Sequence, residues 1–409
     1  MQETPRSDRM HIAIFGRRNA GKSSLINALT NQPIALVSDI PGTTTDPVYK
    51  SMEMLPLGPV VLIDTAGIDD VGSLGELRVQ RTMEVLHKTD LAILLIDPQV
   101  GIDDFELELV QQIRAQGIPL IGAVNKVDTV QSLEAQPDWE TRLNLKLHRI
   151  STQTKEGINE LRELIIHTAP TDWQAPTILG DLIQPGDTVV MVVPIDLEAP
   201  KGRLILPQVQ TLRDILDHNA QAVVVKEDGL SAVLDNLRQP PKLVVTDSQA
   251  FHQVNAIVPP EISLTSFSIL FARYKGDLLS LVKGARQVAA LKPGDRILVA
   301  EACTHHPIGE DIGRIKIPRW LSQRVSELEF AWATGSHFPA DLNRYSLVIH
   351  CGACMINRRE MLHRIRQVQA AGVPIVNYGV LIAYLHGILE RALAPFPEAK
   401  RLWAAASSK

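Results

Sequence analysis

The chain has 409 residues, of which 45% are hydrophobic and 21% charged, and this composition is typical of a globular protein with about two to four domains. It carries 41 Lys and Arg against 46 Asp and Glu, with no basic run interleaved with aromatic residues, so we expect no nucleic-acid partner. No apolar run reaches the about 18 residues that cross a bilayer, and the N-terminus lacks a secretion or transit pattern, which predicts a cytoplasmic protein without membrane contact.

Residues 9–170 alternate short apolar runs with helical stretches. The apolar runs lie at 12–15, 60–63, 91–96 and 120–124. This alternation is typical of a parallel sheet covered by helices, and it predicts an α/β domain. Prolines and glycines gather between His167 and Asp187, where we place the first domain boundary.

Two smaller α/β domains are predicted to follow. Residues 180–260 repeat a Val-rich strand and a helix three times, without a glycine fingerprint or a cysteine. Strand edges are templates for pairing, so we expect this domain to mediate homodimerisation. Pro259 and Pro260 mark the second predicted boundary. Residues 263–409 contain strand patterns at 296–300, 346–349 and 374–378, with helical patterns between them.

A phosphate-binding loop follows the first strand. The sequence reads G-R-R-N-A-G-K-S from Gly16 to Ser23, and the helical pattern begins at Ser24. Strand, loop and helix in this order predict a P-loop, whose backbone N–H groups cradle phosphate oxygens. Lys22 is expected to reach the β- and γ-phosphates, and Ser23 to bind Mg²⁺. The residues that we expect to bind nucleotide here also include Gly16, Asn19, Ala20, Gly21 and Ser24.

Two further motifs end predicted strands. Asp64 and Gly67 belong to D-T-A-G, which places a carboxylate near Mg²⁺ and a backbone N–H near the γ-phosphate. Asn125, Lys126 and Asp128 belong to N-K-V-D, where the Asp accepts the N1–H and 2-amino protons of guanine. Adenine lacks both donors, so this motif predicts selectivity for GTP.

In these motifs the chain resembles the translation-factor-like GTPases, and among them the Era/TrmE group. The resemblance also covers G-T-T-T-D at 42–46 and the pair Ser151 and Thr152. It implies that Thr44 senses Mg²⁺ and the γ-phosphate, that Lys22, Thr44 and Gly67 serve hydrolysis, and that Ser151 and Thr152 contact guanine.

Two positions of the GTPase motifs leave the mechanism open. Asn19 resembles the residue that holds K⁺ beside the phosphates in the TrmE-like group, but a turn Asn in the left-handed conformation explains it equally well. Ile68 stands where Ras-type enzymes carry a water-orienting Gln, so intrinsic hydrolysis should be slow or should depend on another group.

All three cysteines lie in the last third of the chain. Cys303 and His305 follow one predicted strand, and His350, Cys351 and Cys354 follow another. Neighbouring parallel strands would bring both groups to the carboxyl edge of one sheet. Thiolates with histidines suit either zinc or an iron–sulfur cluster.

The order C-x-H, 44 residues, H-C-x-x-C after a TrmE-like domain resembles the (FeFe)-hydrogenase maturation GTPases of the HydF family. The resemblance implies a P-loop GTPase domain followed by two smaller α/β domains, one for dimerisation and one for cluster binding. It also implies a 4Fe-4S cluster on Cys303, Cys351 and Cys354, and a scaffold or carrier role for a transient two-iron precursor. Radical-SAM maturases and apo-(FeFe)-hydrogenase are the partners it implies. The fourth cluster ligand stays open among His305, His350, a carboxylate such as Glu301, and solvent.

Two other functions fit the same motifs. A tRNA-modifying or ribosome-associated GTPase could hold a structural zinc with these cysteines, and a regulatory GTPase could carry a redox-sensing cluster. The net charge of −5 disfavours the nucleic-acid alternative.

Overall fold

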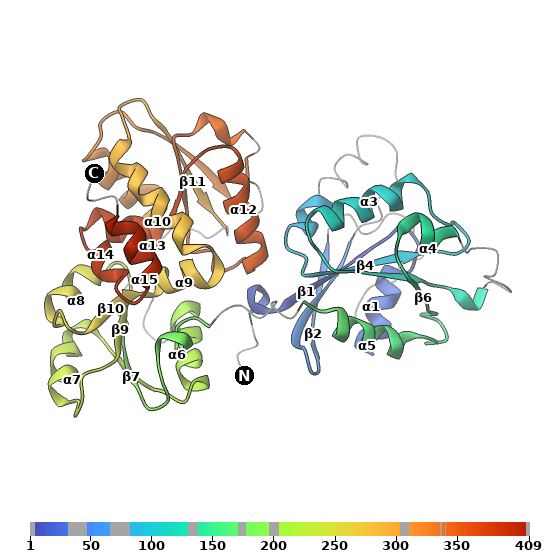
Figure 1. The fold of residues 1–409 in the computed structure, drawn as a ribbon, viewed down its shortest axis with the longest axis horizontal. Helices are drawn as coiled ribbons and strands as arrows, with labels where there is room; N and C mark the ends of the chain where they lie inside the picture. Colours follow the sequence, from blue (N-terminus) through green and yellow to red (C-terminus); the bar gives the residue numbers. More distant parts are fainter. Residues whose placement is uncertain are drawn as a thin grey trace. The chain divides into compact units, whose positions relative to one another are not determined.

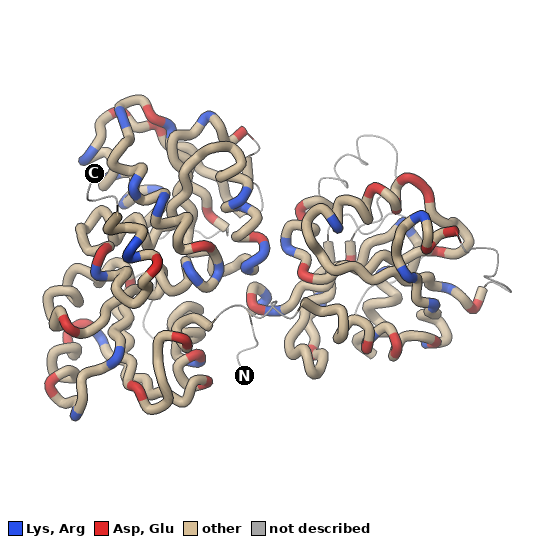
Figure 2. Tube along the Cα trace, in the orientation of Figure 1, with Lys and Arg blue, Asp and Glu red and all other residues tan. Residues whose placement is uncertain are grey.

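The computed structural model describes residues 5–31, 47–65, 82–129, 138–170, 177–195, 204–302, 311–335, 338–339 and 341–405. The chain divides into two compact units, Met1–Gln174 and Ala175–Lys409, each built on β-sheets with helices packed against them (Figure 1). Lys and Arg are interspersed with Asp and Glu along both units (Figure 2). None of the helices in the described ranges is both long and apolar enough to cross a bilayer.

The first unit holds a six-stranded sheet in the order β2-β3-β1-β4-β5-β6. All neighbouring strands run parallel except β2 and β3. The strands are β1 (Met10–Phe15), β2 (Val48–Met54), β3 (Gly58–Asp64), β4 (Leu91–Ile96), β5 (Leu120–Val124) and β6 (Leu147–Arg149). The helices are α1 (Lys22–Thr30), α3 (Asp104–Ala115), α4 (Asp138–Leu143) and α5 (Ile158–Thr168).

Strand β1 shows why this sheet is covered on both faces. All of its residues are buried, and successive side chains enter two different cores. Ile12 and Ile14 belong to the core that contains residues of α1 and α5, whereas Ala13 and Phe15 belong to the core that contains residues of α3. The predicted α/β fold is therefore confirmed. The fully parallel sheet is not, because the half-exposed edge strand β2 runs antiparallel to β3 and its sequence lacks a buried-strand pattern.

The second unit holds two four-stranded parallel sheets, in the orders β10-β9-β7-β8 and β12-β11-β13-β14. The strands of the first sheet are β7 (Thr188–Val192), β8 (Gln221–Val225), β9 (Leu243–Thr246) and β10 (Ser263–Ser266). Those of the second are β11 (Arg296–Glu301), β12 (Glu329–Thr334), β13 (Leu347–His350) and β14 (Ile375–Asn377). The helices are α6 (Leu206–Asp217), α7 (Leu230–Asn236), α8 (Phe251–Ile257), α9 (Phe267–Lys275), α10 (Leu278–Gln287), α11 (Ile317–Ser322), α12 (Arg358–Ala370), α13 (Tyr378–Leu385), α14 (Leu389–Ala392) and α15 (Pro397–Ala404).

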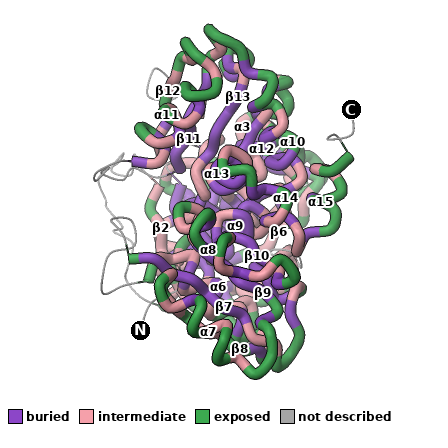
Figure 3. Tube along the Cα trace, turned by 90° about the vertical axis from the view of Figure 1, so that its left-hand side faces the viewer, coloured by how far each residue is buried: buried purple, intermediate pink, exposed green. Residues whose placement is uncertain are grey.

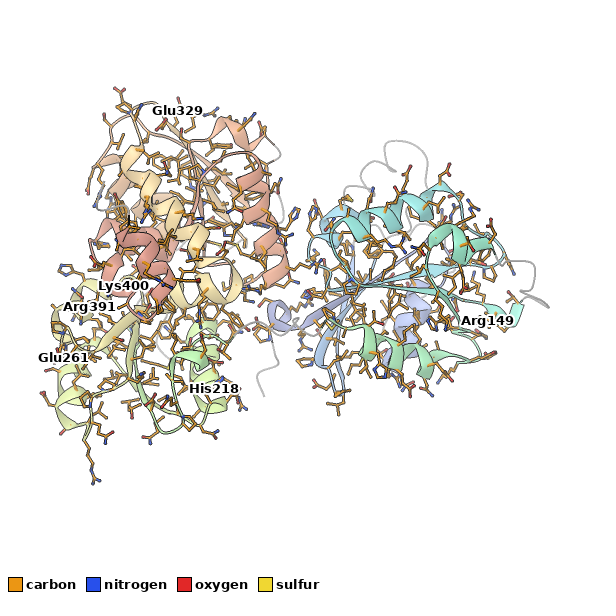
Figure 4. All side chains as sticks on the ribbon, in the orientation of Figure 1. Arg149, His218, Glu261, Glu329, Arg391 and Lys400 are labelled. Carbon is orange, nitrogen blue, oxygen red and sulfur yellow. The ribbon has the colours of Figure 1, made fainter. Side chains whose placement is uncertain are left out.

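One hydrophobic core runs through both sheets of the second unit. Their inner strands, among them β9 and β13, are buried on both faces (Figure 3). Polar contacts add to this core. Arg391, labelled in Figure 4, reaches from α14 to the backbone oxygens of Asn255, Val258 and Pro259 at 3.0, 2.7 and 2.7 Å. These contacts anchor α14 to the connection between β9 and β10.

The structure differs from our second predicted boundary. Strand β10 follows Pro259 and Pro260, yet it pairs with β9 and completes the sheet that begins with β7. The two prolines therefore lie in a connection within that sheet and not between domains. Prolines indicate where the chain turns, but they do not show which sheet the next strand joins.

Candidate functional site

The phosphate-binding loop connects β1 to α1 and depends on two glycines. A Cβ on Gly16 would lie 2.3 Å from the backbone oxygen of Leu95, and a Cβ on Gly21 would lie 2.2 Å from Nδ2 of Asn125. Gly21 also has a φ of +95°. Neither position has space for a side chain, so the loop packs directly against the neighbouring strand and the guanine motif. Asn19 has a φ of 60°, a conformation that Asn tolerates, and this value does not distinguish its two interpretations.

The residues predicted for phosphate and Mg²⁺ meet at the start of α1. Nζ of Lys22 donates to the backbone oxygens of Gly16 and Arg17 at 2.9 and 2.8 Å. The hydroxyl of Ser23 donates to Oδ2 of Asp64 at 2.5 Å, and Ser24 continues the helix. Burial raises the pKa of Asp64, while the Ser23 hydrogen bond and the Lys22 charge oppose that rise. Two other residues predicted for this site, Thr44 and Gly67, lie outside the described residues.

The guanine motif at the end of β5 is joined to the phosphate-binding loop. Asn125 is fully buried, and its Nδ2 donates to the backbone oxygen of Ala20 at 2.9 Å. Its Oδ1 accepts the backbone N–H of Thr152 at 3.1 Å. The Ser151 hydroxyl donates to Asp128 at 2.5 Å and fixes the carboxylate that we expect to bind guanine. One buried amide thus connects three loops that are far apart in the sequence.

Sequence reasoning missed three acidic partners of this site. Lys126 donates to Oδ2 of Asp97 at 2.6 Å, just after β4. Arg17, inside the phosphate-binding loop, forms ion pairs with Asp103 and Glu106 at the start of α3. The pattern D-x-x-E at Asp103–Glu106 is a readable helix-capping signal, but no sequence signal indicates that Glu106 pairs with Arg17.

The carboxyl edge of the β12-β11-β13-β14 sheet is where we predicted the cysteine site. As predicted, the two strands that lead to the cysteines are neighbours, since Ala300 in β11 lies opposite His350 in β13. The backbone N–H of Ala302 donates to Sγ of Cys351 at 3.1 Å. Cys351 and Cys354 are half-buried thiols on one turn. Cys303 and His305 lie outside the described residues, and among those that are described no three His, Cys, Asp or Glu side chains form a metal-binding group.

His350, one candidate for the fourth ligand, already has polar contacts within the protein through both ring nitrogens. It is fully buried, with Nδ1 2.9 Å from the backbone oxygen of Cys351 and Nε2 3.3 Å from Nη1 of Arg364. A carbonyl accepts and a guanidinium donates, so Nδ1 carries the proton. Burial and the Arg364 charge lower the pKa of His350 to about 3, which keeps the ring neutral. Both ring nitrogens therefore already have a protein partner.

Glu301, the carboxylate candidate, also has partners. It is 3% exposed, accepts the Tyr378 hydroxyl at 3.2 Å, and lies 3.7 Å from the Arg314 guanidinium. Burial and the Glu301 charge raise the pKa of Tyr378, which keeps the phenol protonated as the donor. Glu301 thus lies beside the cysteine turn as part of an existing network.

Three family models match consecutive parts of the chain. The model of the 50S ribosome-binding GTPase matches residues 11–126, the hydrogen maturase F dimerization domain matches 178–276, and the hydrogen maturase F tetramerization domain matches 279–395. The dimerization model includes β10, in agreement with the strand pairing. The chain therefore carries a GTPase domain followed by two domains named for self-association.

Individual relatives match only the GTPase part. GTPase Der of Geobacter metallireducens is 33% identical over 162 residues, 39% of this chain and 36% of that protein. The tRNA modification GTPase MnmE of Bacillus licheniformis is 36% identical over 153 residues, 37% of this chain and 33% of that protein. The chain thus spans about a third of the length of these curated relatives.

Solved structures resemble the chain weakly. Era in complex with MgGDPNP and part of 16S ribosomal RNA is 20% identical with a TM-score of 0.37, covering 54% of this chain and 93% of its own. Toc33 from Arabidopsis thaliana, bound to GDP and Mg²⁺, is 15% identical with a TM-score of 0.32, covering 41% and 86%. Because two hydrogen maturase F models match consecutively after the GTPase domain and together span more than half of the sequence, the chain belongs to the hydrogen maturase F family of GTPases.

Proposed function

We propose that this GTPase is a scaffold and carrier for the maturation of (FeFe)-hydrogenase, holding a 4Fe-4S cluster and the two-iron precursor of the hydrogenase active site. One observation carries the metal half of the proposal. The residue before Cys303 donates its backbone N–H to Sγ of Cys351. Ala302, the last described residue before Cys303, therefore lies beside the C-x-x-C turn, and this contact supports a site that would join Cys303 to that turn.

The donor set fits an iron–sulfur cluster. Cys303, Cys351 and Cys354 would supply three thiolates, which are soft ligands, and Cys351 already accepts an N–H as cluster-binding thiolates do. Because His350 and Glu301 have other partners, the contacts favour His305 or solvent at the fourth position. A bound cluster would supply one iron with an exchangeable ligand, where the two-iron precursor could be attached.

The GTPase half rests on the contacts at α1. Ser23 and Asp64 already meet, and with Thr44 they would hold Mg²⁺, which supplies charge neutralisation at the phosphates. Lys22 would leave the two loop carbonyls for the β- and γ-phosphates, and Gly67 would offer its N–H to the γ-phosphate. Asn19 would hold K⁺ in the place of an arginine finger.

The β10-β9-β7-β8 sheet offers a surface for homodimerisation. β8 is an edge strand of that sheet, and Val224 within it is 45% exposed. An edge with unpaired backbone groups and an exposed valine is a template for pairing with a second copy. We further propose that radical-SAM maturases and apo-hydrogenase are the partners that deliver and receive the precursor.

The metal content of anaerobically purified protein tests the proposal. We expect iron and acid-labile sulfide in a ratio near one, and a broad absorption band at the blue end of the visible spectrum. Cys351→Ser should lose the iron, the sulfide and the absorption band. A zinc-filled site without iron would contradict the proposal. It would favour the alternative of a tRNA-modifying or ribosome-associated GTPase with a structural zinc, which the hydrogen maturase F models do not favour.

A further inference from the structure

The Arg17 side chain, in the phosphate-binding loop, pairs with two carboxylates at the start of helix α3. Its Nε and Nη2 donate to Oε1 and Oε2 of Glu106 at 2.7 and 3.1 Å, and Nη2 also pairs with Asp103. The arrangement is bidentate, the geometry in which Arg binds a carboxylate most strongly. The Glu106 side chain is 3% exposed, so the pair is shielded from solvent on one side. These acceptors raise the pKa of Arg17, which stays charged.

The same acidic residues fix the start of α3. Asp103 accepts the backbone N–H of Phe105 at 2.9 Å, and Glu106 accepts that of Asp103 at 2.9 Å, which together form a capping box. The Glu106 carboxylate is therefore held by the capping box as well as by Arg17. A fixed acceptor lowers the conformational entropy lost when the ion pair forms.

The other end of the β4–α3 connection holds the guanine loop. Asp97 accepts the ammonium of Lys126 at 2.6 Å through Oδ2 and the backbone N–H of Gln99 at 2.9 Å through Oδ1. Lys126 has a φ of 60°, an unfavourable backbone conformation for Lys. Residues 97–106 thus contact the guanine loop at one end and the phosphate-binding loop at the other.

We infer that the β4–α3 connection positions both nucleotide-binding loops, with Arg17 as the positioning residue of the phosphate-binding loop and Asp97 that of the guanine loop. The backbone oxygen of Arg17 accepts the Lys22 ammonium, so fixing the Arg17 side chain also fixes the backbone that Lys22 contacts. This inference concerns the guanine-nucleotide site alone and is independent of the metal site.

Substitutions of Arg17 and Asp97 should affect different properties of nucleotide binding. Arg17→Met keeps the apolar stem and the capping box but removes the ion pair, and we expect GDP affinity to fall about tenfold. The KM for GTP should rise and kcat should fall as well, because Arg17 positions the backbone that Lys22 contacts and Lys22 is expected to reach the γ-phosphate as well as the β-phosphate. The affinity ratio of GDP to inosine diphosphate should not change, since both carry the same phosphates.

Asp97→Asn should instead change the selectivity for the base. Releasing Lys126 loosens the loop that carries Asp128, so the ratio of GDP to inosine diphosphate affinity should fall by about tenfold. Arg142→Met is the control, because Arg142 pairs with Asp138 in α4 at 4.0 Å and both side chains are exposed. It should leave both the affinity and the ratio unchanged.

Calorimetric titration of GDP and inosine diphosphate into the full chain, with steady-state GTP hydrolysis, distinguishes the outcomes. Arg17→Lys keeps the charge without the bidentate fork and should lie between wild type and Arg17→Met. The double variant Arg17→Met with Glu106→Gln should bind GDP no more weakly than Arg17→Met alone, because the two residues act through one contact. Wild-type GDP affinity in Arg17→Met, or an equal loss of base selectivity in both single variants, would overturn the inference.

Discussion

Replacing Arg364 by Met should destabilise the second unit, because this guanidinium is a buried link between three elements around the cysteine turn. It is 3% exposed and donates to the backbone oxygen of Gly335 and to Oε1 of Glu360, both at 2.8 Å. It also lies 3.3 Å from Nε2 of His350 and 5.4 Å from the ring centroid of Phe338. Met keeps the stem packing but leaves a carbonyl, a ring nitrogen and a carboxylate without this donor.

The size of the effect follows from those three groups. Removing one partner of a buried ion pair costs about 3–5 kcal/mol, and the partial exposure of Glu360 favours the lower end, about 3 kcal/mol. For a unit of this length each kcal/mol lowers Tm by about 3 °C, which gives a shift of about 9 °C. Arg213→Met is the matched control, since Arg213 and Asp217 form an exposed i,i+4 pair in α6. That variant should lose at most about 0.5 kcal/mol.

Thermal unfolding by circular dichroism measures both variants. Excess GDP should raise the transition of the GTPase unit and separate it from that of the second unit. Because the unpaired carboxylate supplies most of the cost, adding Glu360→Gln to Arg364→Met should recover about half of the lost stability. If Arg364→Met melts within about 2 °C of Arg213→Met, or if Glu360→Gln gives no recovery, the buried-charge argument is wrong.

Four further predictions concern function. Asp128→Asn should weaken GTP turnover and favour xanthosine triphosphate, whose base offers an acceptor at position 2, and equal turnover of ATP and GTP by the unmodified chain would contradict the guanine assignment. Replacing Na⁺ by K⁺ should speed hydrolysis and Asn19→Ala should remove the difference; without a cation effect Asn19 is a turn residue only. Cys351→Ala should abolish iron binding and hydrogenase activation but keep GTP hydrolysis. Lys22→Ala should abolish GTP hydrolysis and spare the cluster. Cysteine variants that still activate apo-hydrogenase would exclude the scaffold role. Val224→Glu on the edge of β8 should weaken self-association in sedimentation, and an unchanged assembly would place the interface elsewhere.

Much of the site could be predicted because its residues are contiguous. The phosphate-binding loop, the guanine motif and the C-x-x-C turn each lie on one short segment that follows a strand. The strand rule then extended the prediction across the chain: two strands followed by cysteines were expected to be neighbours, and β11 and β13 are. That step succeeded because parallel strands place their carboxyl ends on one edge.

The contacts that hold those segments could not be predicted in the same way. Arg17 and Glu106 are separated by 89 positions, and His350 and Arg364 belong to different elements. An Arg in a loop and a Glu in a helix are each ordinary surface residues until the fold brings them together. The strand β12 was missed for a related reason, since its exposed edge position imposes no buried pattern on its sequence.

The guanine motif and the C-x-x-C turn each combine an unfavourable backbone conformation with a buried polar anchor. Lys126 and Ala353 have φ values of 60° and 57°, a left-handed conformation that costs residues other than glycine about 1–2 kcal/mol. Such conformations persist only where the surroundings determine them. At Lys126 the anchor is the Asp97 carboxylate. Next to Ala353, between the two thiols of the C-x-x-C turn, the His350 ring holds the Cys351 carbonyl and is itself held by Arg364. His350 therefore serves this region best as a neutral hydrogen-bond donor, since recruiting its Nε2 to a metal would require the Arg364 contact to break, whereas a ligand from solvent would leave both anchors in place.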